Sequence, residues 1–299
     1  MLSFISSLPG PIAQGIIWGI MAMGVYITFR ILDIADLTVD GSMATGGVTL
    51  VVCMTNGMNV VLALLVAFLV GCLAGLVTGM FHTKFGIPAI LAGILTQLIL
   101  YSVNLRITNQ RSNVPLSVDK YNILLSLRNL NRAILVSALF AAAIIAIMYW
   151  FFGTELGHSL RATGCNQNMA RANGINTDTN KIIGLVISNG LVALSGALLA
   201  QYQGFADINM GRGAIVIGLA AVIIGEVLLG KIFKNFALKL LAAVIGGIIY
   251  YIVITIVLRA GLNANDLKMF SALVVAVFLG IPYWQRKISE KRSTKGAEG

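Results

Sequence analysis

The segment Thr154–Lys181 has the sequence TELGHSLRATGCNQNMARANGINTDTNK and is a polar interruption of a strongly apolar chain. The runs on either side are apolar for about 20 residues, long enough for a helix to cross ~30 Å of hydrocarbon. Gly164 and Gly174 predict two short helices, because glycine commonly ends a helix. A short amphipathic helix can dock in a groove of a partner protein; an ordinary solvated loop is the other interpretation. The small apolar face of the segment consists of Leu156, Leu160 and Ala162.

The composition is typical of an integral membrane protein. Hydrophobic residues make up 58% of the 299 residues and charged residues only 11%, whereas soluble domains contain roughly a quarter charged residues. Mean hydropathy is +0.90. Strands that alternate over ~10 residues, as in outer-membrane barrels, are absent. We therefore predict an all-α integral membrane protein that forms a single transmembrane domain over residues 1–299.

Apolar windows predict a polytopic bundle of about nine transmembrane helices, within a range of roughly eight to ten. The predicted spans are Ile12–Phe29, Ala35–Met54, Val60–Met80, Gly86–Tyr101, Ala133–Phe152, Ile182–Gln201, Gly213–Leu229, Phe236–Leu258 and Met269–Trp284. The first run is expected to be a span and not a signal peptide, because Met1–Pro11 contains no basic residue and no small-residue cleavage pattern follows.

The second predicted span contains carboxylates and glycines in the sequence DIADLTVDGSMATGGV, which begins at Asp33. Carboxylates near membrane depth are costly and tend to face a cavity or a partner group. Clustered glycines there indicate a broken or re-entrant helix whose free backbone groups are covered by protein or water. For Asp36 an N-cap role is the simpler interpretation, and for Asp40 a pathway-facing and a structural role remain open.

Basic residues predict the orientation by the positive-inside rule. The tail 285–299 and the loop Gly230–Lys239 are rich in lysine and arginine and belong in the cytoplasm. Counting spans then places Thr154–Lys181 in the cytoplasm and the N-terminus outside. The loop Asn104–Arg132 disagrees, because it is basic and yet falls outside. Either the count is off by one, or these positive charges bind something external.

No catalytic, nucleotide-binding or metal-binding constellation is visible in the sequence. The stretch Gly225–Ile232 matches part of a phosphate loop but lacks the Ser or Thr that would bind Mg²⁺. His82 and His158 have no Cys or carboxylate at metal-ligand spacing. The three cysteines are expected to be inert. The net charge of +10 lies mainly in loops that flank spans, which indicates anionic lipid as its partner and not nucleic acid.

The segment LGHSLRATGCNQNMARANGI resembles the cytoplasmic coupling segment of ABC importer permeases of the branched-chain amino acid and ribose class. Four further stretches, FRILDIADLTVDGSMATGG, LVTGMFHTKFGI, LAGILTQLILYSVNLRI and SNVPL, resemble the branch associated with tryptophan- or tyrosine-type substrate-binding lipoproteins. The resemblance extends from Gly15 to Trp284, with Cys165 and Arg212 as departures. The residues that match the coupling pattern are Leu156, Gly157, Leu160, Arg161, Ala162, Gly164, Asn166, Ala170, Gly174 and Ile175.

The resemblance implies a permease of the bacterial cytoplasmic membrane that pairs with a second copy, most simply as a homodimer. Each copy would dock a cytosolic ATPase, which binds ATP and Mg²⁺ itself, so that this chain needs no cofactor and no catalytic site. One extracytoplasmic binding lipoprotein would deliver the cargo, which is expected to be an amino acid, with aromatic amino acids as candidates. The alternative is an ion-coupled secondary transporter, for which paired deep carboxylates in two related halves would be expected.

The resemblance and the polar residues of the spans together give two further sets of candidate residues. Asp40, Ser42, Thr96, Gln97, Asn104, Ser188 and Asn189 are candidates for lining the substrate pathway, although polar groups also pack between membrane helices. Arg106, Arg111, Arg128 and Arg132 are candidates for docking the binding protein.

Overall fold

The computed structural model describes residues 8–117, 120–121, 123–230 and 232–259, together with 269, 272–273, 275–277 and 280. Helices dominate this part of the chain, and two short strands pair antiparallel with Val114 opposite Ala206. The elements are α2 Pro9–Tyr26, η1 Ile27–Ile31, α3 Thr38–Thr55, α4 Val60–Thr83, α5 Ala89–Ile107, β1 Asn113–Pro115, α6 Leu130–Phe152, α7 Glu155–Cys165, α8 Gln167–Ala172, α9 Thr177–Gln203, β2 Phe205–Asp207, α10 Ala214–Leu229 and α11 Phe236–Arg259.

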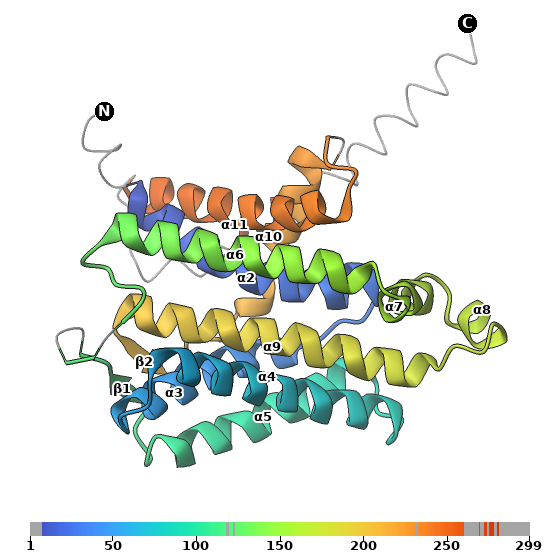
Figure 1. Ribbon diagram of the computed structural model, residues 1–299, viewed down its shortest axis with the longest axis horizontal. Coiled ribbons are helices and arrows are strands. Elements are labelled where there is room, and N and C mark those ends of the chain that lie inside the picture. The colour runs from blue at the N-terminus through green and yellow to red at the C-terminus, as the bar shows by residue number, and fades with distance from the viewer. Residues whose placement is uncertain are drawn as a thin grey trace, which may run out of the picture.

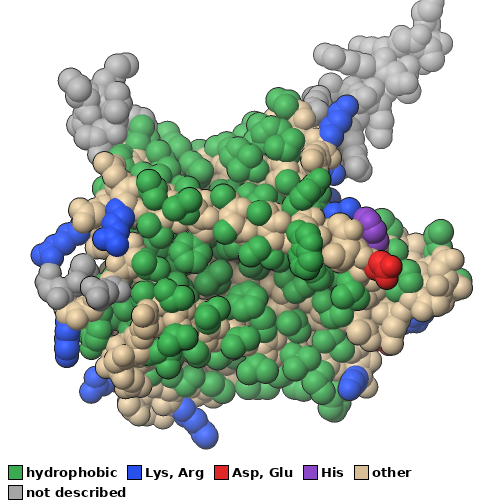
Figure 2. Space-filling view, in the orientation of Figure 1, with side chains coloured by type: hydrophobic (Ala, Val, Ile, Leu, Met, Phe, Trp, Pro, Cys, Tyr) green, Lys and Arg blue, Asp and Glu red, His purple; other side chains and the backbone are tan. Residues whose placement is uncertain are grey.

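The long helices lie side by side along one axis of the molecule (Figure 1). The short helices α7 and α8 project at one end, and the β1–β2 pair lies at the other. A wide band of hydrophobic side chains separates basic side chains at the two ends (Figure 2). This distribution fits a bundle that crosses a membrane, with its charged groups near the two surfaces.

Six helices in the described residues are long and apolar enough to span a membrane, namely α2 with η1, α4, α5, α6, α9 and α11. Helix α10 is apolar but shorter, and α3 is almost wholly buried among other helices. The predicted helical membrane fold is confirmed, while the count of about nine spans and the broken or re-entrant second helix stay predictions. Most of the ninth predicted span, Met269–Trp284, and all of the tail 285–299 lie outside the described residues.

Helix α9 is at the centre of the bundle and contacts α2, α3 and α4. Glycines allow the backbones to approach closely: a Cβ at Gly71 of α4 would meet the carbonyl oxygen of Asn189 at 2.5 Å, and one at Gly46 of α3 would overlap the backbone of Ala193. In lipid, helices associate through packing at such small-residue faces and not through a hydrophobic drive. The central position of α9 therefore depends on the small residues of its neighbours.

The chain leaves regular α-helix between α2 and α3. Helix α2 ends in the π-helical turn η1, and Asp33 then adopts a left-handed conformation with φ of 54°. Helix α3 begins at Thr38, three residues after the predicted start at Ala35. The carboxylate of Asp36 accepts a hydrogen bond of 2.9 Å from the backbone amide of Thr38, which is an Asx-turn just before the helix. The N-cap residue is Leu37 and has no side-chain cap, so the predicted N-cap role of Asp36 is wrong.

Helix α10 begins after a turn at Gly213, which has a φ of 86°. Glycine adopts this left-handed conformation without the steric cost that other residues have. Gly225, with which the phosphate-loop-like stretch begins, lies inside α10 against the backbone of Ala242 in α11. The stretch is thus helical as far as Leu229 and does not form a loop that could surround a phosphate.

Candidate functional site

The polar segment forms two helices, as predicted, and both have side-chain caps. Oγ1 of Thr154 accepts a hydrogen bond from the amide of Gly157 at 3.4 Å, and Oδ1 of Asn166 accepts one from the amide of Met169 at 3.0 Å. Gly174 follows α8 with a φ of 78°. These caps satisfy amides that a helix terminus leaves free, so the segment has a defined shape at the end of the bundle.

The predicted helix break at Gly164 is wrong. Helix α7 continues through Gly164 to Cys165, and the break falls at Asn166, whose backbone is extended with φ of −158° and ψ of 104°. Gly164 is required for a different reason: a Cβ at this position would overlap the carbonyl oxygen of Ile31 in η1. The glycine brings α7 into direct contact with the π-helical turn at the end of the first span.

The inner side of α7 is attached to the bundle by packing and by a stacked cation. Leu160 is fully buried and borders Gly184 of α9. The guanidinium carbon of Arg161 lies 4.6 Å from the ring centre of Phe236 and 5.4 Å from that of Phe152. A cation over two aromatic rings is attracted by their π faces. Arg161 therefore joins α7 to the end of α6 and the start of α11.

The outer side of the polar segment exposes apolar side chains. Leu156 is 53% exposed and Met169 is 65% exposed, although each lies in a segment rich in polar residues. Met169 was missed in the sequence because only its exposure distinguishes it from a core methionine. Of the ten predicted coupling residues, Gly157, Leu160 and Ala170 are buried, Arg161, Ala162, Gly164 and Ile175 are half-buried, and Leu156, Asn166 and Gly174 are exposed.

A hydrogen-bonded network connects α3 to the middle of α9. Nδ2 of Asn189 donates to Oδ2 of Asp36 at 2.7 Å, and Oγ of Ser42 donates to Oδ1 of Asn189 at 2.6 Å. A chain of hydroxyls runs from Thr38 through Thr78 to Thr96, at 2.7 and 2.9 Å. Buried polar groups that are satisfied in this way rigidify a core.

Four of the seven pathway candidates lie in such contacts between helices. Ser42, Thr96 and Asn189 belong to the network, and Oγ of Ser188 donates to the carbonyl of Gly24 in α2 at 2.8 Å. All four side chains are fully or almost fully buried. In this conformation they connect helices and do not line the cavity described below.

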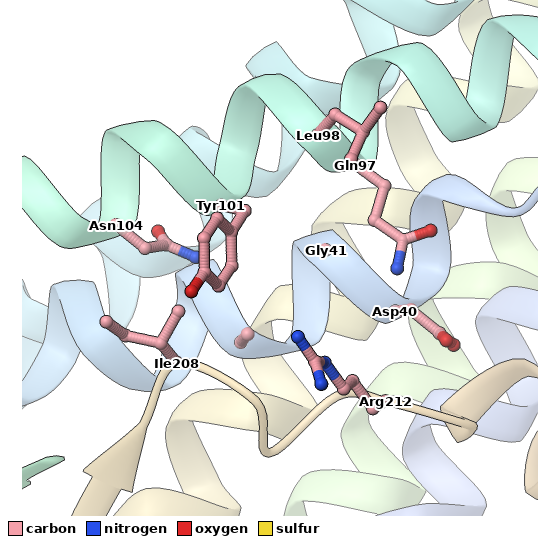
Figure 3. A pocket seen from close by; sticks show the side chains of 9 residues that line it. Asp40, Gly41, Gln97, Leu98, Tyr101, Asn104, Ile208 and Arg212 are labelled. Atoms are coloured by element: carbon pink, nitrogen blue, oxygen red, sulfur yellow. The ribbon is translucent and has the colours of Figure 1, made fainter. Parts of the chain in front are cut away.

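The other three candidates, Asp40, Gln97 and Asn104, line one cavity of about 270 Å³. Gln97 points from α5 towards Asp40 of α3, Tyr101 of α5 points towards Ile208, and Arg212 of the turn before α10 lies between them (Figure 3). Tyr101 and Arg212 were not predicted as pathway residues, because their approach depends on how α5 packs against a distant turn. The remaining lining residues are Gly41, Ala44, Leu98 and Ile208.

Asn104 has an unsatisfied acceptor in this cavity wall. Its side chain is 1% exposed, and its Oδ1 atom has no hydrogen-bond partner among the described residues. A buried amide oxygen without a partner costs about 1–3 kcal/mol. The cavity wall also contains the carboxylate of Asp40 and the guanidinium of Arg212.

Asp40 also holds the first turn of α10. Its Oδ2 accepts a hydrogen bond from the amide of Gly213 and its Oδ1 one from the amide of Ile215, each at 2.9 Å. At the other end of α10, Glu226 forms an ion pair with Arg30 of η1. The short helix is thereby bound at one end to the cavity wall and at the other to the turn that α7 contacts.

The four arginines predicted to dock a binding protein are all exposed. Arg106 is in the last turn of α5 and Arg132 in the first turn of α6, and Arg111 and Arg128 lie in the connection between these helices. This connection includes β1, so the arginines belong to the end of the bundle opposite to α7 and α8 (Figure 1).

A bundle of apolar helices with an ordered polar helix pair at one end and a polar cavity among its spans fits a membrane transport protein. Its fold is similar to that of a solved metal-chelate type ABC transporter, with a TM-score of 0.52 at 13% identity over 93% of this chain and 86% of that one. The chain belongs to the family described as the permease component of branched-chain amino acid transport systems, whose model matches residues 10–282. It is therefore the permease component of an ABC transporter, and the alternative of an ion-coupled secondary transporter is set aside.

Curated relatives agree with this family. A tyrosine transport system permease protein of Clostridioides difficile is 43% identical over 92% of this chain and 90% of its own length. An uncharacterized protein of Rickettsia prowazekii is 37% identical over 89% of this chain and 94% of its own length. An autoinducer 2 import system permease protein of Yersinia pseudotuberculosis is 28% identical over 70% of this chain.

Proposed function

We propose that this chain is the membrane subunit of a binding-protein-dependent importer for an amino acid. The observation that carries the proposal is the cavity of Asp40, Asn104 and Arg212, which offers groups of opposite charge within one site. A tyrosine transport permease among the relatives supports an amino acid as cargo.

The cavity has the chemistry to recognise the two charged ends of an amino acid. The guanidinium of Arg212 can pair with an α-carboxylate in two parallel hydrogen bonds. Each carboxylate oxygen has two acceptor sites, so Asp40 can accept from an α-ammonium group while it continues to hold α10. The ring of Tyr101 is a surface for an aromatic side chain.

The open side of the cavity suggests where a second copy sits. Leu98 and Tyr101 of α5 line the cavity and are 62% and 42% exposed. In a homodimer, the same face of the second permease would cover these residues and enclose the pathway between the two copies. A cavity of about 270 Å³ near such an interface would be a second selective site, which the cargo meets after its release from the binding protein.

The polar helices α7 and α8 supply the connection to a cytosolic ATPase. Leu156 and Met169 are exposed apolar side chains of the kind that anchor a short helix in a partner's groove. On this proposal the α7 end is cytoplasmic and the β1–β2 end is external, in the cytoplasmic membrane of a bacterium. Closure of the ATPase pair around ATP and Mg²⁺ would move α7 and α8 as a lever, and η1 would follow α7.

The exposed arginines of the β1–β2 end are proposed to bind acidic residues of the external binding protein. Reversal of charge at Arg111 and Arg128 should then lower the ATPase stimulation that the loaded binding protein causes, because rim charges mainly control association. Unchanged stimulation at low ionic strength would count against this role.

The cargo assignment is tested by uptake into proteoliposomes that contain the permease and its ATPase, with the external binding protein saturated by either cargo so that the preference measured is that of the permease. We expect the wild type to favour an amino acid over its carboxamide by at least about tenfold, which corresponds to ~1.4 kcal/mol. Arg212→Gln should lose most of this preference, because it removes the partner of the carboxylate. Ser102→Ala is the matched control, since Ser102 is on α5 and exposed but does not line the cavity. Equal preference in Arg212→Gln and wild type would refute the site.

A further inference from the structure

A basic groove lies at the α7 end of the bundle, where α6 ends and α11 begins. It consists of two adjoining cavities of about 600 and 310 Å³, which share Arg161, Lys234 and Phe236 in their walls. The larger cavity is also lined by Tyr149, Trp150, Phe152, Gly153, Thr154, His158 and Asn235. The smaller one is also lined by Tyr26, Arg30, Ile31, Cys165 and Lys239.

The groove carries an excess of positive charge. Arg30, Arg161, Lys234 and Lys239 line it, and no aspartate or glutamate is among the described lining residues. Glu226 pairs with Arg30 from outside this set. Three cations therefore remain for an anionic ligand. Arg161 is already oriented by its contacts with Phe152 and Phe236, so binding would order few additional side-chain rotamers.

The outer wall of the groove continues into a lipid-facing surface. Trp150 is 72% exposed and Tyr149 is 51% exposed in the last turn of α6. The same helix exposes Leu135, Leu139 and Ile147 along its length. Tryptophan and tyrosine concentrate at the level of lipid headgroups in membranes. The groove thus opens at headgroup depth, beside a surface suited to acyl chains.

We propose that this groove binds the phosphate headgroup of an anionic phospholipid, with its acyl chains along α6. Basic pockets between membrane helices at the cytoplasmic side are suited to anionic headgroups. A free phosphate would use the cations alone, whereas the exposed Trp150 and Tyr149 favour a ligand that is also apolar. The inference depends neither on the cargo nor on the direction of transport. The headgroup would lie against α7, the helix assigned to ATPase coupling, and would hold it at the membrane surface.

The test is native mass spectrometry of the full-length permease in detergent, with phosphatidylglycerol or phosphatidylcholine of the same acyl chains. We expect phosphatidylglycerol to be retained preferentially, and Lys234→Gln to weaken its binding about fivefold, as expected for one basic residue near an anionic surface. Lys84→Gln is the matched control, because Lys84 is an exposed lysine that directly follows α4 and does not line the groove. Lys234→Arg should restore the preference and excludes a general folding defect.

Three results would overturn the proposal. Phosphatidylglycerol binding that is equal in Lys234→Gln and Lys84→Gln would show that the groove is not the site. Displacement of the lipid by millimolar inorganic phosphate would identify a site for free phosphate. Complete displacement by the ATPase subunit would show that the groove belongs to the protein partner.

Discussion

One carboxylate oxygen of Asp40 in α3 accepts a hydrogen bond of 2.9 Å from the backbone amide of Ile215 in α10. The other oxygen accepts one of the same length from the amide of Gly213. Helix α10 has no side-chain cap of its own, so a residue 175 positions earlier in the chain takes this role. A negative charge at this position also complements the positive end of the helix dipole. The start of α10 is therefore determined by a neighbouring helix.

Replacement of Asp40 by asparagine should destabilise the start of α10. Asparagine keeps one acceptor oxygen but loses the charge and the second acceptor, and the loss of a helix cap costs about 0.5–2 kcal/mol. Thermal unfolding in detergent, followed by circular dichroism, should show a lower transition temperature. Asp33→Asn is the control, because Asp33 is exposed and its left-handed backbone conformation suits asparagine. Equal transition temperatures for the two variants would contradict the capping role.

The free-energy costs of removing the Asp36 and Asn189 side chains should not be additive. Asn189→Ala leaves the buried carboxylate of Asp36 without its 2.7 Å partner, and an unpaired buried group of this kind costs about 1–3 kcal/mol or more. In Asp36→Ala/Asn189→Ala that unpaired group is gone. A double-mutant cycle of unfolding free energies should therefore give a coupling energy of roughly 0.5–3 kcal/mol. Additive effects would show that the two side chains act independently.

A methyl group at Gly164 should impair the contact between α7 and η1. The Cβ of Gly164→Ala would overlap the carbonyl oxygen of Ile31, and overpacking of this kind costs typically about 1–3 kcal/mol. We expect less uptake per ATP hydrolysed, measured in proteoliposomes with the ATPase subunit. Gly10→Ala is the control, because the nearest atom to a Cβ there is the hydroxyl of Tyr202 at 3.8 Å. A normal ratio of uptake to hydrolysis in Gly164→Ala would argue against a lever that acts through η1.

Exchange of the charges in the Arg30–Glu226 pair should preserve function that either single reversal impairs. Arg30→Glu and Glu226→Arg each place two like charges together at the junction of η1 and α10. The double variant Arg30→Glu/Glu226→Arg restores an attractive pair. Because both side chains are partly exposed, the pair is worth at most about 1 kcal/mol in stability. The informative measurement is therefore uptake per ATP hydrolysed, and failure of the double variant to recover would indicate that another property of Arg30 is needed.

Much of the bundle follows from the sequence, because hydrophobic runs locate the membrane helices. The prediction for α10, Gly213–Leu229, differs by one residue from Ala214–Leu229, and that for α11, Phe236–Leu258, differs by one from Phe236–Arg259. Predictions from local sequence failed where contacts between elements determine the position of a helix end. Gly164 was interpreted as a helix stop, although it serves a close approach to Ile31.

The cavity could be predicted only in part. The pathway candidates were chosen because polar groups within apolar spans are costly and often functional. Three of them line the cavity, namely Asp40, Gln97 and Asn104. The other four candidates have the same signal but are bonded between helices: Ser42 to Asn189, Thr96 to Thr78, and Ser188 to the backbone of α2. No local pattern separates the two groups. The contribution of Arg212 requires the turn before α10 to fold back against α3, which a single sequence does not reveal.

The attachment of α10 at both of its ends has a mechanical consequence. At 1.5 Å per residue, its 16 residues form a rod about 24 Å long. One end is joined through Glu226 to η1, which touches α7, and the other is joined to Asp40 in the cavity wall. A rod of hydrogen-bonded helix resists compression, so a shift of η1 by an ångström should arrive at the cavity almost undiminished. The cargo site would then be remodelled by a push along α10.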